Sequence, residues 1–379
     1  MKFMKFAAGA ALALAVVGCG QEQSATSDAK DSAAVVAAKV YEPKVMDGAA
    51  IALQYRKNTA EALKPIVDAM ASCFKAGVSE GLAKSSDEEV AKAKKFYTDS
   101  GLEGADVKWA LVTVGEGVTI AELESDKVPE VAVAVAFDHD MDKIVAALLA
   151  TLDENEKKEL VETKIGGVKA WKVDNEDVKK DGAEPCFASL DGKLWLGATT
   201  PAVLERLVAL YTDDKGASAA FATLSSGNDA VVRFFVPALG EFVKKAAAGH
   251  ESELSAVDML IPNGSKILLG IGEVDWALLA NASGVSLKLS ANTAAEGDAE
   301  SLRTMLNALL TSAVDGLKES TDEEEKLAYS ALKDLKLGGE GKAFVATMPI
   351  PDELVKKIAD EISSVNGLLG GADETGDGE

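Results

Sequence analysis

The sequence has little of what enzymes and nucleic-acid-binding proteins commonly use. Histidine occurs twice in 379 residues, cysteine three times, and aromatic residues make up 5% of the chain. Because histidine is a frequent general base and metal ligand, few residues are available for histidine-based catalysis or metal-assisted hydrolysis. Basic residues number 39 against 62 acidic ones, a net charge of −23. This acidity argues against a nucleic-acid partner and against a face that lies on anionic lipid headgroups.

The start of the chain lacks a hydrophobic run long enough to span a bilayer comfortably. The uncharged run from Phe6 to Val17 contains 12 residues, whereas a membrane-spanning helix needs about 20. Lys2 and Lys5 precede this run, and small residues follow it. A basic start, a short apolar segment and small residues before a cleavage site are typical of a secretory signal.

A lone cysteine stands directly behind that apolar run. Val16-Val17-Gly18-Cys19 resembles the lipobox of bacterial lipoproteins. The resemblance implies that residues 1–18 are a signal peptide that is removed, and that Cys19 carries the lipid. Several acyl chains hold a soluble body at a bilayer stably, where one chain would not. The alternative is an ordinary signal peptide with a cysteine nearby.

The residue after the cysteine bears on the destination. In diderm lipoproteins an aspartate there favours the inner membrane, so Gly20 implies an outer-membrane protein, facing either the periplasm or the outside. Cys73 and Cys186 would then meet an oxidising compartment and could pair, although the sequence does not show whether their geometry permits a disulfide. Met70, Cys73 and Phe74 share one helical face, which favours core packing of Cys73.

The patterning predicts an α+β protein in two similar halves, residues 48–225 and 226–366, each a mainly antiparallel sheet with helices packed on it. Residues 19–47 are small and polar, and we expect a flexible tether. Residues 367–379 are rich in glycine and acidic residues, and we expect a disordered tail. After removal of residues 1–18 the net charge becomes −25, because Lys2 and Lys5 are lost.

The halves share an order of strand-like and helical segments, which predicts an internal duplication. The matched strand-like pairs are 50–56 with 230–236, 107–116 with 265–274, 131–137 with 285–291, and the closing segments 192–207 with 341–358. Each closing segment contains a strand, a proline turn and an amphipathic helix. Thr200 and Pro201 predict a capped helix start.

The ending "GKLWLGATTPAVLERL" also resembles, loosely, that of secreted and lipid-anchored bacterial α+β proteins of unknown function. This resemblance implies an envelope protein and brings no activity with it.

One cluster of carboxylates invites a metal-binding interpretation. Asp138, Asp140 and Asp142 follow the D-x-D-x-D order that begins a calcium loop. The loop then needs glycine at its sixth position and glutamate at its twelfth, where this chain has Lys143 and Leu149. Aspartates that cap the first turn of a helix explain the pattern more simply.

A second short motif matches the hydrolase nucleophile pattern G-x-S-x-G at residues 77–81. That chemistry needs a strand, a sharp turn and a helix around the serine, but a helical run precedes Ser79 here. His139 and His250 are the available histidine bases. We therefore do not predict a catalytic triad.

The remaining signals favour structural roles. Gly270 and Gly272 lack the third glycine and the helix of a dinucleotide fingerprint, and more simply mark a bulge or a close backbone approach. Aromatic side chains on strand-like segments could line a ligand groove, but packing in the core or on a sheet face is the simpler interpretation. They are Trp109, Trp171, Trp195 and Trp276.

The sequence therefore predicts a lipid-anchored protein of the cell envelope that binds or scaffolds without catalysis, cofactor or metal. We expect acyl chains on Cys19 to attach the protein to the membrane. The alternative is a periplasmic carrier of a lipid or another apolar ligand in a cavity of the duplicated body. An open apolar cavity would favour the carrier, and solid cores would favour scaffolding.

Overall fold

The computed structural model describes residues 40–370 with internal gaps. Outside the described residues lie 1–39, 58–60, 67–68, 70–91, 93–94, 97, 102–106, 116–128, 138–139, 177–178, 180–181, 214, 219–220, 222–229, 247–257, 259–262 and 371–379.

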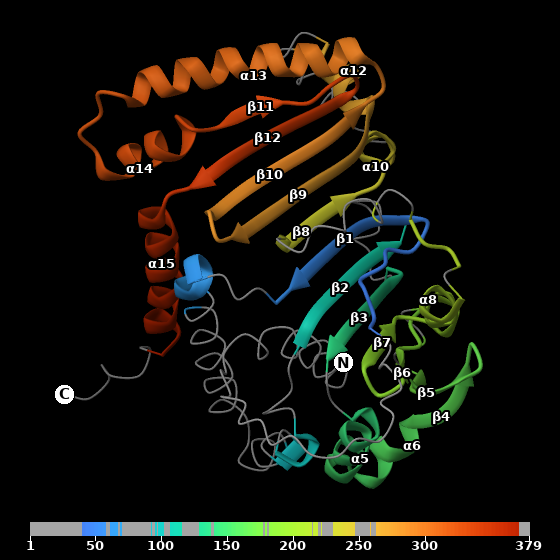
Figure 1. Ribbon diagram of the computed structural model, residues 1–379. Helices are drawn as coiled ribbons and strands as arrows, with labels where there is room; N and C mark the ends of the chain where they lie inside the picture. Colours follow the sequence, from blue (N-terminus) through green and yellow to red (C-terminus); the bar gives the residue numbers. More distant parts are fainter. Residues whose placement is uncertain are drawn as a thin grey trace, which may run out of the picture.

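Twelve strands of the described chain form one antiparallel sheet, with the order β11-β12-β10-β9-β8-β1-β2-β3-β7-β6-β5-β4 (Figure 1). The strands are β1 Ala49–Arg56, β2 Val107–Gly115, β3 Val131–Phe137, β4 Leu160–Ile165, β5 Val168–Val173, β6 Cys186–Leu190, β7 Leu194–Ala198, β8 Ala230–Val236, β9 Ile271–Asn281, β10 Gly284–Thr293, β11 Lys336–Gly338 and β12 Ala343–Ile350. The predicted mixture of helices with a large antiparallel sheet is confirmed.

The two predicted halves are continuous within this sheet, because β1 pairs antiparallel with β8. Outward from that junction, the strands follow the order β1-β2-β3-β7 on one side and β8-β9-β10-β12 on the other. Pairing β1 with β8 satisfies backbone groups that two separate sheets would leave at open edges. The expectation of a sheet for each half is therefore replaced by one shared sheet.

The helices lie against the sheet or beyond its ends (Figure 1). The described helices are the short 3-10 helix η1 Glu61–Leu63, α5 Met141–Thr151, α6 Glu154–Glu159, α8 Pro201–Asp213, α10 Leu239–Ala246, α12 Gly264–Leu269, α13 Glu296–Leu317, α14 Glu323–Leu332 and α15 Asp352–Gly370. Helix α15 continues to Gly370, so it includes the first residues of the predicted tail.

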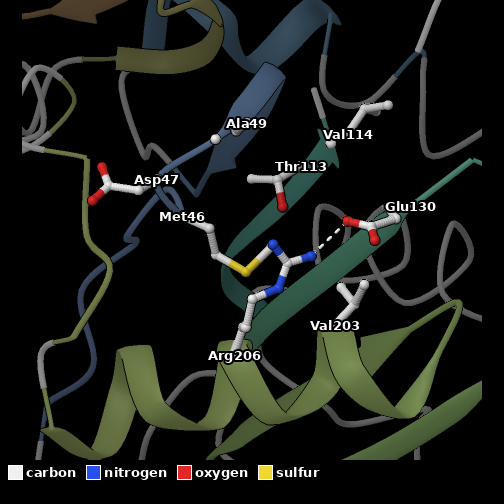
Figure 2. Close-up of a pocket in the computed structure, with 10 residues that line it drawn as sticks. Met46, Asp47, Ala49, Thr113, Val114, Glu130, Val203 and Arg206 are labelled. Atoms are coloured by element: carbon white, nitrogen blue, oxygen red, sulfur yellow. Dashed lines mark hydrogen bonds and ion pairs between the residues drawn. The ribbon is translucent and has the colours of Figure 1, made fainter. Parts of the chain in front are cut away.

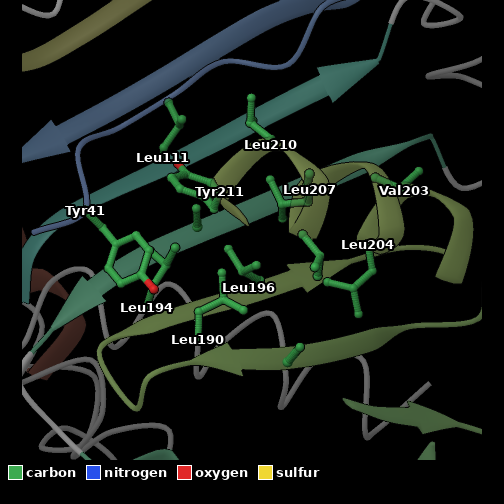
Figure 3. Close-up of a cluster of buried hydrophobic side chains, with 14 of the residues drawn as sticks. Tyr41, Leu111, Leu190, Leu194, Leu196, Val203, Leu204, Leu207, Leu210 and Tyr211 are labelled. Atoms are coloured by element: carbon green, nitrogen blue, oxygen red, sulfur yellow. The ribbon is translucent and has the colours of Figure 1, made fainter. Parts of the chain in front are cut away.

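Helix α8 covers one face of the sheet in the first half. Figure 3 shows its apolar side chains directed at β7 and β3, where Leu204, Leu207 and Leu196 are at most 2% exposed. The predicted start of this helix is confirmed, because Val203 N–H donates to Thr200 Oγ1 at 3.4 Å. The alternation of apolar residues on the strands thus builds a solid core here.

The packed body begins before the predicted boundary at residue 48. Tyr41 and Val45, which fall in the predicted tether, are 8% and 1% exposed. The Trp109 indole donates to the carbonyl of Tyr41 at 2.8 Å, and the Tyr41 hydroxyl donates to Asp191 Oδ2 at 2.6 Å. These bonds explain why the segment packs on the body although its composition resembles a linker.

One predicted strand is wrong. Residues 264–269 form helix α12, and the strand β9 begins only at Ile271. The backbone N–H of Ser265 donates to Asp258 Oδ1 at 2.9 Å, and Gly270 N–H donates to the carbonyl of Lys266 at 3.0 Å at the other end. A short apolar run is compatible with either helix or strand, so these terminal hydrogen bonds decide the outcome.

Candidate binding surface

Three large apolar side chains are exposed beside one another at the junction of the two halves. Leu53 on β1, Phe234 on β8 and Trp276 on β9 are 47%, 38% and 38% exposed. Leu53 lies opposite Phe234, and Phe234 lies opposite Trp276. Side chains directly opposite in an antiparallel pair have Cβ atoms about 5 Å apart. The three residues therefore form one contiguous patch, which we name the apolar strip.

The apolar strip is the most exposed part of a longer row of apolar residues across the sheet. Trp276 lies opposite Leu289 on one side, and Leu53 lies opposite Val112 on the other. Both flanking residues are half-buried. Opposing residues share a face of the sheet, so the whole row points to the same side.

Neighbouring parts of this face are covered. Ile144 and Val145 of α5 pack in one buried cluster with Val135 of β3. A second buried cluster covers the end of β1 and the start of β8. It contains Leu63 of η1 and Val355 of α15, and the sheet contributes Tyr55, Val232 and Leu278. The apolar strip thus lies between two covered regions of the same face.

The opposite face of the same three strands is buried and carries three polar side chains among apolar ones such as Ala52 and Phe235. Gln54, Arg233 and Asp275 are 3%, 6% and 3% exposed. Each is adjacent in sequence to a residue of the apolar strip, and successive side chains of a strand point to opposite faces. Arg233 Nε lies 3.3 Å from Asp275 Oδ1, and the Arg233 guanidinium carbon lies 6.0 Å from the centre of the Phe221 ring. At these three pairs of neighbouring residues the polar side chain is buried and the apolar one is exposed, which reverses the usual polarity locally.

This reversal is unfavourable for stability taken alone. Among the described residues, Gln54 Oε1, Arg233 Nη1 and Asp275 Oδ1 have no hydrogen-bond partner. A buried ion pair must offset the loss of hydration of both charges, and it rarely does so fully. Burial raises the pKa of the Asp275 carboxyl although Arg233 opposes this change, and burial lowers the pKa of Arg233. Local stability thus does not account for the arrangement.

A small pocket opens near the start of β1, between β2 and α8 (Figure 2). It encloses about 240 Å³, including the solvent at its mouth. Met46, Thr113 and Val203 are among its lining residues. Arg206 Nη2 lies 2.5 Å from Glu130 Oε2, and both side chains are more than half exposed. Most of this space is open solvent, and the enclosed part is about 10 Å³, which is room for about one water molecule. The pocket is therefore too small for a ligand site, and its charged mouth does not suit an apolar ligand.

The structure assigns a capping role to one of the predicted aspartates. Asp140 precedes α5, and its Oδ1 accepts a hydrogen bond from the backbone N–H of Asp142 at 3.0 Å. The described residues contain no group of three or more His, Cys, Asp or Glu side chains placed to hold a metal ion. Asp138 and His139 lie outside the described residues. For Asp140, the interpretation as a helix cap is confirmed.

Other predicted residues also lie outside the described part of the chain, namely Cys19, Cys73, Ser79 and His250. Cys186 on β6 is a buried free thiol whose Sγ lies 3.8 Å from the carbonyl oxygen of Ala198. Burial raises the pKa of this thiol to about 12. Since the thiolate is the reactive form, Cys186 acts as a core residue.

The tryptophans divide between core and surface. All four lie on strands as predicted, and Trp109 and Trp171 are 3% and 4% exposed. Trp195 is half-buried, whereas Trp276 belongs to the apolar strip. Trp276 therefore lies on a sheet face and not in the core. The overlooked signal was Arg233 and Asp275, two opposite charges on mainly apolar strands, each next to an aromatic residue in the sequence.

Within the described residues, no helix combines the length and the apolar composition that crossing a membrane requires.

Comparisons with known proteins give no family. No family model matches the chain, and no curated protein matches it. Crystal form III of TP0453 is similar at 11% identity and a TM-score of 0.35, over 84% of this chain and 96% of that one. Form I has 10% identity and 0.34, over 86% and 98%, and form IV has 10% and 0.37, over 84% and 94%. TM-scores this low establish neither a shared fold nor a shared function.

Proposed function

We propose that the protein is a lipid-anchored protein of the cell envelope with a non-catalytic binding role, and that its body binds through the apolar strip. One observation carries the binding role, namely that Leu53, Phe234 and Trp276 are exposed in one register row on adjacent strands. Soluble proteins keep contiguous exposed apolar patches small, and the larger ones are often functional, so a patch shared by three adjacent strands supports an interaction site here. The side chains of this strip offer neither an acid nor a base, so they act by excluding water.

The sequence supports the anchor and the location. The lipobox residues Val16 to Cys19 support acylation at Cys19, and Gly20 supports the outer membrane. Among the described residues, packing begins at Tyr41, and 21 residues of sequence lie between it and Cys19. Extended at about 3.4 Å per residue, this tether reaches about 70 Å. The body can therefore meet partners at a distance from its own membrane.

The first four strands on each side of the β1–β8 pair match in order, β1-β2-β3-β7 with β8-β9-β10-β12, and this supports an internal duplication. If the two halves arose by duplication, the apolar strip crosses the β1–β8 boundary between the two copies. A joint is a place where the surface of an ancestral unit can remain in use for binding.

Intact mass tests the anchor. The protein is purified from membranes of its own host, and its mass is measured before and after delipidation. Loss of residues 1–18 with acyl mass on Cys19 is expected. An unmodified Cys19 refutes the anchor.

Site-specific photo-crosslinking in the envelope tests the binding role. A photoreactive phenylalanine analogue replaces Phe234 of the apolar strip or, as the control, Leu309, which is 58% exposed on α13. Adducts at position 234 in excess of those at position 309 are expected. Equal yields at the two positions refute the apolar strip as the binding surface.

The carrier alternative requires a cavity. The pocket of Figure 2 has about 240 Å³ and a charged mouth, so it does not favour that function. Lipid that remains bound to the delipidated body would support the carrier instead.

A further inference from the structure

We infer that the apolar strip is the docking site of a cationic amphipathic helix from a partner protein. This inference rests on the proposed function and names the chemistry of the partner. It combines the spacing of the strip, its area, its lack of charge and the acidity of the whole chain.

The spacing of the strip matches the spacing of a helix surface. Leu53, Phe234 and Trp276 occupy three adjacent strands, which lie about 4.8 Å apart. A helix that crosses the strands presents an apolar residue every three or four positions, which is about 5 Å of rise. Three successive apolar side chains of such a helix can each face one residue of the strip.

The area of the strip excludes a second copy of this chain as the occupant. With about 200 Å² for each large side chain, exposures of 47%, 38% and 38% leave about 250 Å² in total. A stable dimer buries about 800 Å² on each partner. Two copies also carry the same negative charge and repel each other. The exposed area of the strip instead matches a contact with one face of a single helix.

The charge distribution sets the chemistry of the helix. No residue of the strip is charged, and the flanking Leu289 and Val112 are also apolar. A charge buried against this row would lack a partner, so the face of the partner helix that contacts the row must be apolar. The other faces of the partner helix are close to the body of this protein, whose chain has 62 acidic and 39 basic residues. Lysine or arginine on its other faces therefore complements the body and accelerates association.

The strip is also preformed. Arg233 and Asp275 are held on the opposite face of β8 and β9, so the strand alternation directs Phe234 and Trp276 outward. Each strand is hydrogen-bonded to neighbours on both sides. Docking therefore needs little reorganisation of this surface.

The test measures binding of a labelled peptide of about 18 residues, five helical turns with a leucine stripe and lysine elsewhere. The protein is the processed chain, residues 19–379, with Cys19→Ser in place of the acylated residue. Binding is followed by fluorescence anisotropy of the label, and the contact by the tryptophan emission of the protein. The matched pair of variants is Trp276→Thr, which keeps a residue that favours strands, and Leu309→Gln on α13.

We expect Trp276→Thr to weaken binding about 30-fold, as loss of a central aromatic anchor does. Leu309→Gln should stay within about 2-fold, because one exposed side chain outside the contact contributes little. Trp276→Phe should retain most of the binding and lose the blue shift of tryptophan emission. Thermal melting confirms that each variant is folded.

Four results overturn the inference. They are no binding of the peptide, equal losses in Trp276→Thr and Leu309→Gln, equal binding of a leucine/glutamate peptide with the same stripe, and an emission shift with phosphatidylcholine vesicles but not with the peptide. The last result identifies a lipid surface as the occupant. Crosslinks at position 234 without peptide binding would leave the proposed function standing and remove only the helix.

Discussion

The buried pair of Arg233 and Asp275 offers the most discriminating test of the reversed polarity at the junction. The variants are Asp275→Leu, Arg233→Met and the two combined, each close in volume to the residue that it replaces. Removing one partner of a buried ion pair costs about 3–5 kcal/mol, because the other charge is left unpaired. Replacing both by apolar residues is often neutral or stabilising, by about 1–4 kcal/mol.

The structure further predicts that the two single variants differ. In Asp275→Leu, the guanidinium of Arg233 stays 6% exposed and is still repelled by Arg56, so the cost should lie near the top of that range, about 5 kcal/mol. In Arg233→Met, Asp275 can accept a proton, because burial already raises its pKa, and Lys288 still attracts its charge. The cost should then lie near the lower end, about 3 kcal/mol.

Urea unfolding, followed by circular dichroism, measures the free energy of unfolding of the processed chain and its variants. The double-mutant cycle should show a coupling of more than about 2 kcal/mol between the two positions. Single variants that each cost less than about 1 kcal/mol and add without coupling would refute the reasoning. Such a result would mean that water reaches both groups and that the junction is not reversed in polarity.

Three further predictions concern single groups. Burial raises the pKa of Asp275 above its ordinary value of 3.8, so the stability that its protonated form contributes is complete below that pH and is lost as the pH rises through the folded-state pKa. The free energy of unfolding of Asp275→Asn should therefore improve relative to wild type as the pH rises above about 4. The opposite trend would contradict this reasoning. The Asp140→Ala variant should lose about 1 kcal/mol through the missing cap on α5, and calcium should not change the melting temperature of the wild type; a calcium-dependent rise would reinstate a metal site. In the Cys73→Ser variant of the acylated protein, Ellman's reagent should find no reactive thiol before urea is added, because burial raises the pKa of Cys186 to about 12; rapid reaction would show either an accessible Cys186 or an unmodified Cys19.

Local features were the most predictable from sequence. The cap at Thr200 and the cap at Asp140 each depend on a hydrogen bond to a backbone group two or three residues away, so a short stretch contains all the information. The alternation that predicted most strands is similarly local. Helix α12 was not predicted because its six residues fit both patterns, and the backbone N–H of Ser265 at its start donates to Asp258, seven residues away.

By itself, the sequence determined the net charge of −23 and the alternation that makes Leu53 point away from Gln54, and Trp276 away from Asp275; the lipid anchor at Cys19 stays a prediction. Only the tertiary structure decided which of the two faces is buried. That choice depends on the pairing of β1 with β8, across about 180 residues of chain, and on the segments that cover each face. Alternation sets the relative direction of neighbouring side chains, whereas burial depends on distant residues, so the apolar strip appeared only when the strands were assembled.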